Sequence, residues 1–207
     1  MCIRDRDLPY VGTKTAELFQ PELKNIEVMH CLRGIDLIHT PQNDPDLFEK
    51  EAADLDTALL PAENLKGIFE AYEYVLIDCP PSLGRKLVAA LAMGTHVICP
   101  VQVSGFAVDG IEGLISTVLG IKEEYNPTLK FSGIFVNNLD KASKNSARAL
   151  SRLEGAVGDL LLENKIMHRP PIDTAIDAGV PIASLGYGHV AAKEVNAVMA
   201  EIIKRVG

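Results

Sequence analysis

The chain has 207 residues, of which 47% are hydrophobic and 23% are charged, a composition that is typical of a folded globular protein and excludes global disorder. Acidic side chains outnumber basic ones by 28 to 20, and the formal net charge of −8 argues against a basic coat for nucleic acid but leaves room for a local basic patch. No apolar run approaches the roughly 18 residues that a membrane span requires. The four cysteines form no C-x-x-C pair, so we expect no disulfide framework, no zinc site and a cytoplasmic location.

The first six residues read Met-Cys-Ile-Arg-Asp-Arg and resemble translated sequencing-adaptor sequence. We therefore expect residues 1–6 to be a non-native leader and residues 7–207 to form a single domain. The charges that alternate at the start of the chain leave no apolar stretch for a signal peptide.

Short apolar runs rich in β-branched residues alternate with longer segments of helical periodicity. The runs predict strands at residues 34–40, 74–79, 95–101, 129–138 and 165–168. The periodic segments predict helices at residues 46–60, 63–72, 83–93, 108–125, 143–163 and 190–206, with Pro61 ending the first of them. This alternation is typical of an α/β fold with a parallel β-sheet and helices on both faces. In such folds the functional side chains gather where the strands end.

Asp78 stands at the end of the predicted strand 74–79. A carboxylate beside a buried strand is costly to desolvate unless it has a partner. At this edge of a sheet the common role is to hold Mg²⁺ beside a nucleotide phosphate. The alternative is a cap for the helix that begins near residue 83, although Ser82 is better placed for that role.

The next two strand ends carry weaker signals. Gln102 follows the strand 95–101, and Asp109 stands in the first turn of the next helix, where the helix dipole favours a carboxylate. Asn137 ends the strand 129–138, and its amide can both donate to and accept from a purine edge. An Asx turn after the strand is the alternative interpretation of Asn137.

Taken together, these segments resemble those of one family. The stretch L-I-D-C-P-P-S-L-G at residues 76–84 resembles the switch II segment of ParA/Soj-type partitioning ATPases, which belong to the deviant-Walker P-loop class that also contains MinD. The stretches that follow keep the family's order: P-V-Q at 100–102, F-A-V-D-G at 106–110, G-I-F-V-N-N-L-D at 133–140 and A-G-V-P-I at 178–182. The resemblance extends from about residue 15 onward and implies a deviant-Walker P-loop NTPase fold.

The resemblance also implies an activity and partners. Proteins of this family bind ATP and Mg²⁺, form a homodimer around two nucleotides and bind DNA non-specifically in that state. A ParB-like centromere-binding protein stimulates hydrolysis, and the cycle moves plasmids or chromosomes over the nucleoid. We expect no membrane partner, because residues 190–206 lack the strongly basic face of a membrane-inserting helix.

The family pattern assigns roles to individual residues. Asp78 would be the catalytic switch II carboxylate and would hold Mg²⁺ through water. The nucleotide would contact Asn137, Arg169 and Pro170. The switch II and dimer face would include Pro80, Pro81, Gln102 and Asp109.

The sequence departs from the family at its phosphate loop. It contains no G-x-x-x-x-G-K-[ST] motif, whose backbone N–H groups and lysine would hold the phosphates. Residues 11–15 read V-G-T-K-T, but the lysine is displaced by one position and no apolar strand precedes it. A switch I motif of the D-x-x-G-N type is also absent. We therefore expect that the first strands and the P-loop are missing, and that the chain as given is inactive although its parent protein is an ATPase.

A basic stripe stands out in this acidic chain. Lys144, Arg148 and Arg152 recur every four residues and so share one face of the predicted helix 143–163. Phosphate contacts need little more than such a stripe. A solvated helix face explains the pattern equally well, and the family resemblance favours DNA binding.

Three alternatives remain open. A MinD-like membrane-associated ATPase would end in a basic amphipathic helix, but Glu194 and Glu201 dilute the charge of residues 190–206, so a helix packed in the core fits better. A GTPase would read guanine through N-x-x-D at residues 137–140, where the usual lysine is replaced by Asn138. A degenerate, nucleotide-free scaffold would explain the missing phosphate loop.

Overall fold

The computed structural model describes residues 11–31, 34–41, 43–80, 82–103 and 107–207, apart from the side chains of residues 107–109. These residues form two compact units. One unit contains residues 96–116 and 130–207 and is called the sheet unit below. The other, called the hairpin unit, contains the described residues up to 95 together with residues 117–129. The expectation of a single domain stays a prediction.

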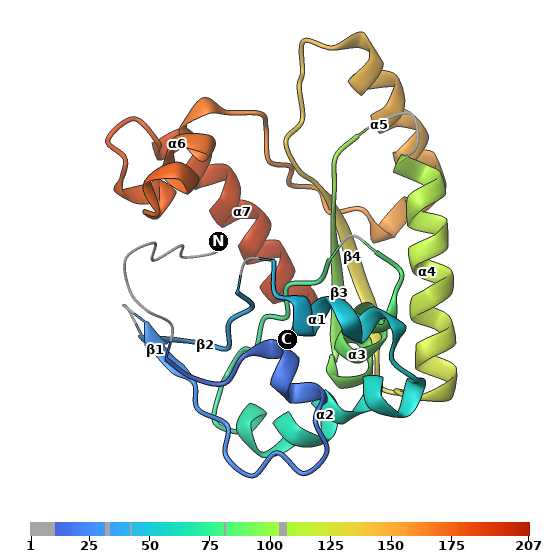
Figure 1. Ribbon diagram of the computed structural model, residues 1–207. Coiled ribbons are helices and arrows are strands. Elements are labelled where there is room, and N and C mark those ends of the chain that lie inside the picture. Colours follow the sequence, from blue (N-terminus) through green and yellow to red (C-terminus); the bar gives the residue numbers. More distant parts are fainter. Residues whose placement is uncertain (1–10, 32–33, 42, 81, 104–106) are drawn as a thin grey trace. The chain divides into compact units, whose positions relative to one another are not determined.

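The sheet unit is built on the parallel pair β3 (His96–Val101) and β4 (Lys130–Val136). Figure 1 shows α4 (Ala107–Glu124) and α7 (His189–Val206) on opposite sides of these strands. Ile134 and Val136 of β4 are fully buried, and they pack with Ile111 of α4 and Leu153 of α5 (Lys144–Val157). The predicted parallel α/β arrangement with helices on both faces is therefore confirmed. The strands expected at 95–101 and 129–138 and the helices expected at 108–125 and 190–206 lie within two residues of their predicted bounds.

Two predictions for the C-terminal part of this unit were wrong. The helix expected at 143–163 begins as predicted, capped by the Ser143 hydroxyl, but ends at Val157, where Gly158 adopts φ +51° and leads into the short helix η4 (Gly158–Leu160). The strand expected at 165–168 is reduced to a parallel bridge between Leu139 and Met167. The helix α6 (Pro170–Ala178) was not predicted, because its proline pair suggested a loop whereas proline is well tolerated in a first helical turn.

The hairpin unit contains β1 (Met29–Cys31) and β2 (Ile35–Leu37), which pair antiparallel. Besides residues 117–124 of α4, its described helices are η1 (Thr15–Phe19), α1 (Pro45–Glu49), η3 (Lys50–Ala52), α2 (Leu55–Phe69) and α3 (Arg85–Met93). The helix α3 ends at Gly94, as predicted. The break expected at Pro61 was wrong: α2 runs through it. The helix begins instead at Leu55, after the N-cap Asp54, whose carboxylate accepts the Thr57 N–H at 2.7 Å. Pro61 is fully buried, and this burial offsets the backbone hydrogen bond that proline cannot donate.

The strand expected at 74–79 is not formed. The segment is irregular and exposed, with 86% of Leu76 and 54% of Tyr74 accessible to solvent. Apolar, β-branched composition favours a strand, but a strand forms only when a neighbour completes its backbone hydrogen bonds. Within the hairpin unit, no described residue pairs with this segment in a β-ladder.

Candidate functional site

The predicted site residues are divided between the two units. Asn137, Arg169, Pro170, Gln102 and the basic stripe belong to the sheet unit, whereas Asp78 and Pro80 belong to the hairpin unit. Each group is therefore described by itself.

The end of β4 carries Asn137 in a half-buried position. Its backbone N–H donates to the Val101 carbonyl at 2.8 Å, which ties the ends of β3 and β4 together. The next residue, Asn138, adopts a left-handed conformation with φ +57°, which asparagine tolerates better than most residues. The Asn138 side-chain oxygen lies 2.8 Å from Nδ1 of His168. The fold thus adds an exposed histidine to this strand end.

Residues 137–139 and 166–169 lie side by side. The Leu139 N–H donates to the Ile166 carbonyl at 3.0 Å, and the His168 N–H donates back to the Leu139 carbonyl at 2.9 Å. The structure therefore brings together the two segments that were predicted to flank a nucleotide base, although they are about thirty residues apart in the sequence. The Asp140 carboxylate accepts the Ala142 N–H at 2.9 Å in an Asx-type turn.

Arg169 is held by a partner that sequence reasoning missed. Its Nε and Nη2 donate to both carboxylate oxygens of Glu194 on α7, at 3.1 Å, 3.1 Å and 2.6 Å. Glu194 also accepts the Met167 N–H at 3.2 Å. The hydrogen bond from Arg169 holds the pKa of Glu194 below its usual value, and Glu194 in turn raises the pKa of Arg169. Such a bidentate pair fixes the guanidinium plane, so the structure positions Arg169 rigidly. Pro170 begins α6 next to it and is exposed.

An open pocket of about 280 Å³ lies beside this strand end. Its apolar lining comes from the loop after β4, from α5 and from the segment before Arg169, and two lysines and one aspartate contribute charge. The lining residues are Leu139, Asp140, Lys141, Ala147, Leu150, Lys165 and Met167. None of the predicted nucleotide contacts is among them.

The basic stripe lies on the outer face of α5. Lys144, Arg148 and Arg152 are all exposed, and Arg148 donates to the Asn145 side-chain oxygen at 2.7 Å. Among the described residues, no carboxylate forms an ion pair with any of the three. The opposite face of α5 carries Leu150, Leu153 and Val157, which pack in the core of the sheet unit. Lys144, Arg148 and Arg152 thus lie exposed on one helix, and their role in DNA binding stays a prediction.

Asp78 lies exposed on the irregular segment 74–80 of the hairpin unit. Pro80 is half-buried, and Pro81 lies outside the described residues. Within the described residues, no group of three His, Cys, Asp or Glu side chains could hold a metal ion. A single exposed carboxylate fits Mg²⁺ only when the ion keeps most of its water and takes further oxygen ligands from phosphates, as the water-mediated role predicted for Asp78 requires.

The remaining two residues of the predicted dimer face belong to the segment after β3. Gln102 directly follows the last residue of β3 and is exposed. Asp109 lies in the first turn of α4, and its side chain is outside the described part of the structure.

Residues 11–15 do not fit a phosphate cradle. The N–H groups of Thr13 and Thr15 donate to the carbonyls of Glu27 and His39, and the Lys14 N–H donates to the Glu17 carboxylate at 2.6 Å. A phosphate loop needs several convergent N–H groups without protein partners. The N–H groups of residues 13–15 already have such partners.

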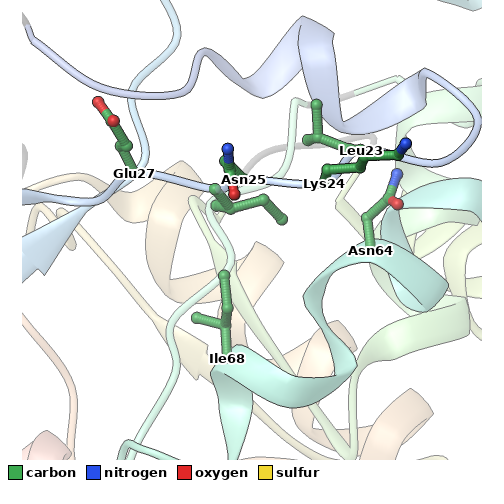
Figure 2. Close-up of a pocket in the computed structure, with 7 residues that line it drawn as sticks. Leu23, Lys24, Asn25, Glu27, Asn64 and Ile68 are labelled. Carbon is green, nitrogen blue, oxygen red and sulfur yellow. The ribbon is translucent and has the colours of Figure 1, made fainter.

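A larger pocket of about 480 Å³ lies in the hairpin unit and contains none of the predicted site residues. Figure 2 shows its labelled lining, to which α2 contributes Asn64 and Ile68 and the segment before β1 contributes Leu23, Lys24, Asn25 and Glu27. The Asn64 amide donates to the backbone carbonyls of Leu18 and Gln20 at 2.8 Å and 2.9 Å. This side chain therefore fastens the N-terminal segment to α2.

Comparison with known proteins identifies the family. The model of the AAA domain family matches residues 19–131. The chain belongs to this family. Within it, the chain resembles the ParA/MinD type: the chromosome-partitioning ATPase Soj of Treponema pallidum is 29% identical over 143 residues, which are 69% of this chain and 56% of that protein. The chain spans about half the length of the curated relatives it matches first.

Solved structures support the ParA-like P-loop fold. The apo McdA structure from Cyanothece matches 95% of this chain and 80% of its own with a TM-score of 0.77 at 19% identity. The Mycobacterium smegmatis cobyrinic acid a,c-diamide synthase, solved with ADP and magnesium, matches 79% of this chain and 66% of its own with a TM-score of 0.63 at 23% identity. The predicted family and fold class are both confirmed. None of the described helices is long and apolar enough to cross a membrane.

Proposed function

We propose that this protein is a ParA-like ATPase that acts in plasmid or chromosome partitioning through ATP-dependent dimerisation and non-specific DNA binding. The observation that carries the proposal is the exposed stripe of Lys144, Arg148 and Arg152 on α5, in a chain that belongs to the ParA/MinD type. Three cations without carboxylate partners among the described residues can each take a DNA phosphate. A net charge of −8 restricts such contacts to this local surface.

The nucleotide side of the proposal uses the two groups of residues described above. Asp78 would hold a hydrated Mg²⁺, which supplies charge stabilisation to the transferring phosphoryl group. Asn137, the rigidly held Arg169 and Pro170 would contact the base. Support comes from the adjacency of segments 137–139 and 166–169 and from a neighbouring fold solved with ADP and magnesium.

The proposed partners are those of ParA-like proteins. A homodimer would form through the face that includes Pro80, Pro81, Gln102 and Asp109, and a ParB-like centromere-binding protein would stimulate hydrolysis on the nucleoid. The 207 residues contain no phosphate-loop motif, and the N–H groups of residues 13–15 have protein partners. We therefore expect the 207-residue chain on its own to bind ATP weakly.

The test uses protein expressed from the complete gene. With Mg·ATP, the wild-type protein should co-sediment with DNA, and three phosphate contacts in each protomer predict a log–log salt slope of about −5.4 for the dimer, or about −2.7 per protomer. The double variant Arg148→Glu/Arg152→Glu should lose DNA binding and keep ATP binding. The matched control Lys66→Glu/Lys122→Glu reverses two exposed lysines on α2 and α4 and should keep the wild-type slope. Unchanged DNA binding in the first variant would contradict the assignment.

A further inference from the structure

The chain that follows Asp78 is fastened by a side chain from a distant segment. Glu51 of η3 accepts the Ser82 hydroxyl at 3.2 Å, and the Lys86 ammonium lies 3.1 Å from the same oxygen, Oε1. Only 28% of the Glu51 side chain and 20% of the Lys86 side chain are exposed. Ion pairs at this degree of burial are screened by solvent less than surface pairs are.

Glu51 also supplies the negatively charged side chain that the start of α3 lacks. The N-cap of α3 is Gly84, which has no side chain to cap the helix, and the first turn contains no acidic residue. Free N–H groups and the helix dipole make this end favourable for a carboxylate. Ser82, which sequence reasoning favoured as the cap, donates its hydroxyl to Glu51 instead.

The groups around Glu51 favour its ionised form. Burial alone would raise the pKa of Glu51, but the ammonium and backbone N–H of Lys86, together with the Ser82 hydroxyl, lower that pKa below its usual value. The carboxylate is therefore ionised at neutral pH. Its second oxygen, Oε2, is buried and has no hydrogen-bond partner among the described residues.

The Glu51 carboxylate occupies the space that a side chain at position 84 would need. A Cβ at this position would lie 2.7 Å from Cδ and 3.0 Å from Oε1 of Glu51, and the three nearest atoms all belong to Glu51. The backbone of Gly84 has φ −92°, which any residue adopts. An alanine here is therefore opposed by the Glu51 carboxylate and not by the backbone.

We propose that Glu51 is a positioning residue that caps α3 from outside the helix and thereby holds the C-terminal end of the switch II segment, residues 82–84, in place. Through this contact the segment that carries Asp78 becomes coupled to the position of α1 and η3. The inference rests on the proposed function, because the position of switch II matters for catalysis only if the protein hydrolyses ATP.

The first measurement follows backbone hydrogen exchange in protein expressed from the complete gene. Glu51→Gln keeps the shape of the side chain and removes its charge, and should speed exchange at residues 82–88 about five- to tenfold, the effect expected from loss of a helix cap. The control Glu49→Gln makes the same change at an exposed residue two positions away and should leave exchange there unchanged. Equal exchange rates at residues 82–88 in the two variants would show that Glu51 does not hold this segment, and would overturn the proposal.

The second measurement is a double-variant cycle on Gly84. Gly84→Ala should speed exchange as Glu51→Gln does, because the new methyl group displaces the carboxylate. In a Glu51→Ala background the same Gly84→Ala change should not speed exchange further, since the carboxylate that the new methyl group would displace is absent. Additive effects of the two changes would mean that Gly84 responds to something other than Glu51, and would overturn the proposal.

The third measurement separates positioning from folding. In steady-state ATP hydrolysis, Glu51→Gln should lower kcat about fivefold and leave KM unchanged, because nucleotide binding does not use this contact. An unchanged kcat with faster exchange would overturn the positioning role. A wild-type protein without ATP hydrolysis would refute the proposed function and the catalytic part of this inference, while the exchange cycle would still decide whether Glu51 holds the loop.

Discussion

Replacing Gly133 by alanine tests how tightly the sheet unit is packed around β4. A Cβ at this position would lie 2.5 Å from Cδ1 of Leu162, 3.1 Å from Nη1 of Arg205 and 3.3 Å from the Leu160 carbonyl. Leu162 is only 1% exposed and has little room to retreat. Arg205 cannot withdraw without loosening its hydrogen bonds to the carbonyls of Ser132 and Leu160, both at 3.3 Å.

The expected cost follows from these contacts and from the backbone of Gly133, whose φ of +159° L side chains rarely adopt. Adding a methyl group to a filled interior costs about 1–3 kcal/mol, and we expect the upper part of that range because a charge-assisted hydrogen-bond donor is displaced as well. For a chain of this size, a loss of 2–3 kcal/mol lowers the melting temperature by about 4–12 °C. Thermal and urea unfolding, followed by circular dichroism, measure both quantities.

A matched control comes from the same unit. Gly155 is exposed on α5, and nothing lies within 4 Å of a Cβ placed there. Gly155→Ala should therefore stabilise the protein by about 0.5–1 kcal/mol, since alanine favours a helix interior. If Gly133→Ala melts at the wild-type temperature, or if both variants are destabilised alike, the packing argument for β4 fails.

Two further predictions concern polar side chains. Asn126 is 8% exposed and donates to the backbone carbonyls of Leu91 and Gly94 at 2.9 Å and 2.7 Å, so Asn126→Ala should cost about 1–3 kcal/mol in urea unfolding; a cost near zero would contradict the bond assignment. Burial would raise the pKa of Glu201, but the N–H groups of Asn164 and Glu163 lower that pKa below its usual value. The stability that Glu201 adds is therefore present at neutral pH and lost as the pH falls through its folded-state pKa. Glu201→Gln should flatten that acid-side loss of melting temperature, and an unchanged pH profile would refute this role.

The elements that could be predicted are those whose cause lies in the nearest few residues. The apolar run before Asn137 predicts β4, and α5 begins after Ser143, within one residue of its predicted start. Gly94 ends α3 as its sequence indicates. Local rules failed where packing overrides them. Pro61 lies inside α2, where its burial compensates for the hydrogen bond that proline cannot donate. Residues 74–79 have a composition that favours a strand, but within the described part of their unit no strand pairs with them.

In the candidate site, too, residue types could be predicted from the sequence, whereas contacts between distant residues could not. Residue type and order were enough to single out Asp78, Asn137, Arg169 and the basic stripe, because a family motif is written along the chain. The partners of these groups were not predictable, since Glu194 lies 25 residues from Arg169 and Glu51 lies 31 residues from Ser82. No local spacing signals contacts at such distances.

By itself, then, the sequence determined the family, the α/β alternation and the side chains able to carry the chemistry, because these depend on residue type and short-range periodicity. Only the tertiary structure decided which of those side chains have partners. It joined Arg169 to Glu194, placed His168 beside Asn138 and set Glu51 at the start of α3. The physical reason is that electrostatic and hydrogen-bond energies depend on distance in space, which the folded backbone sets.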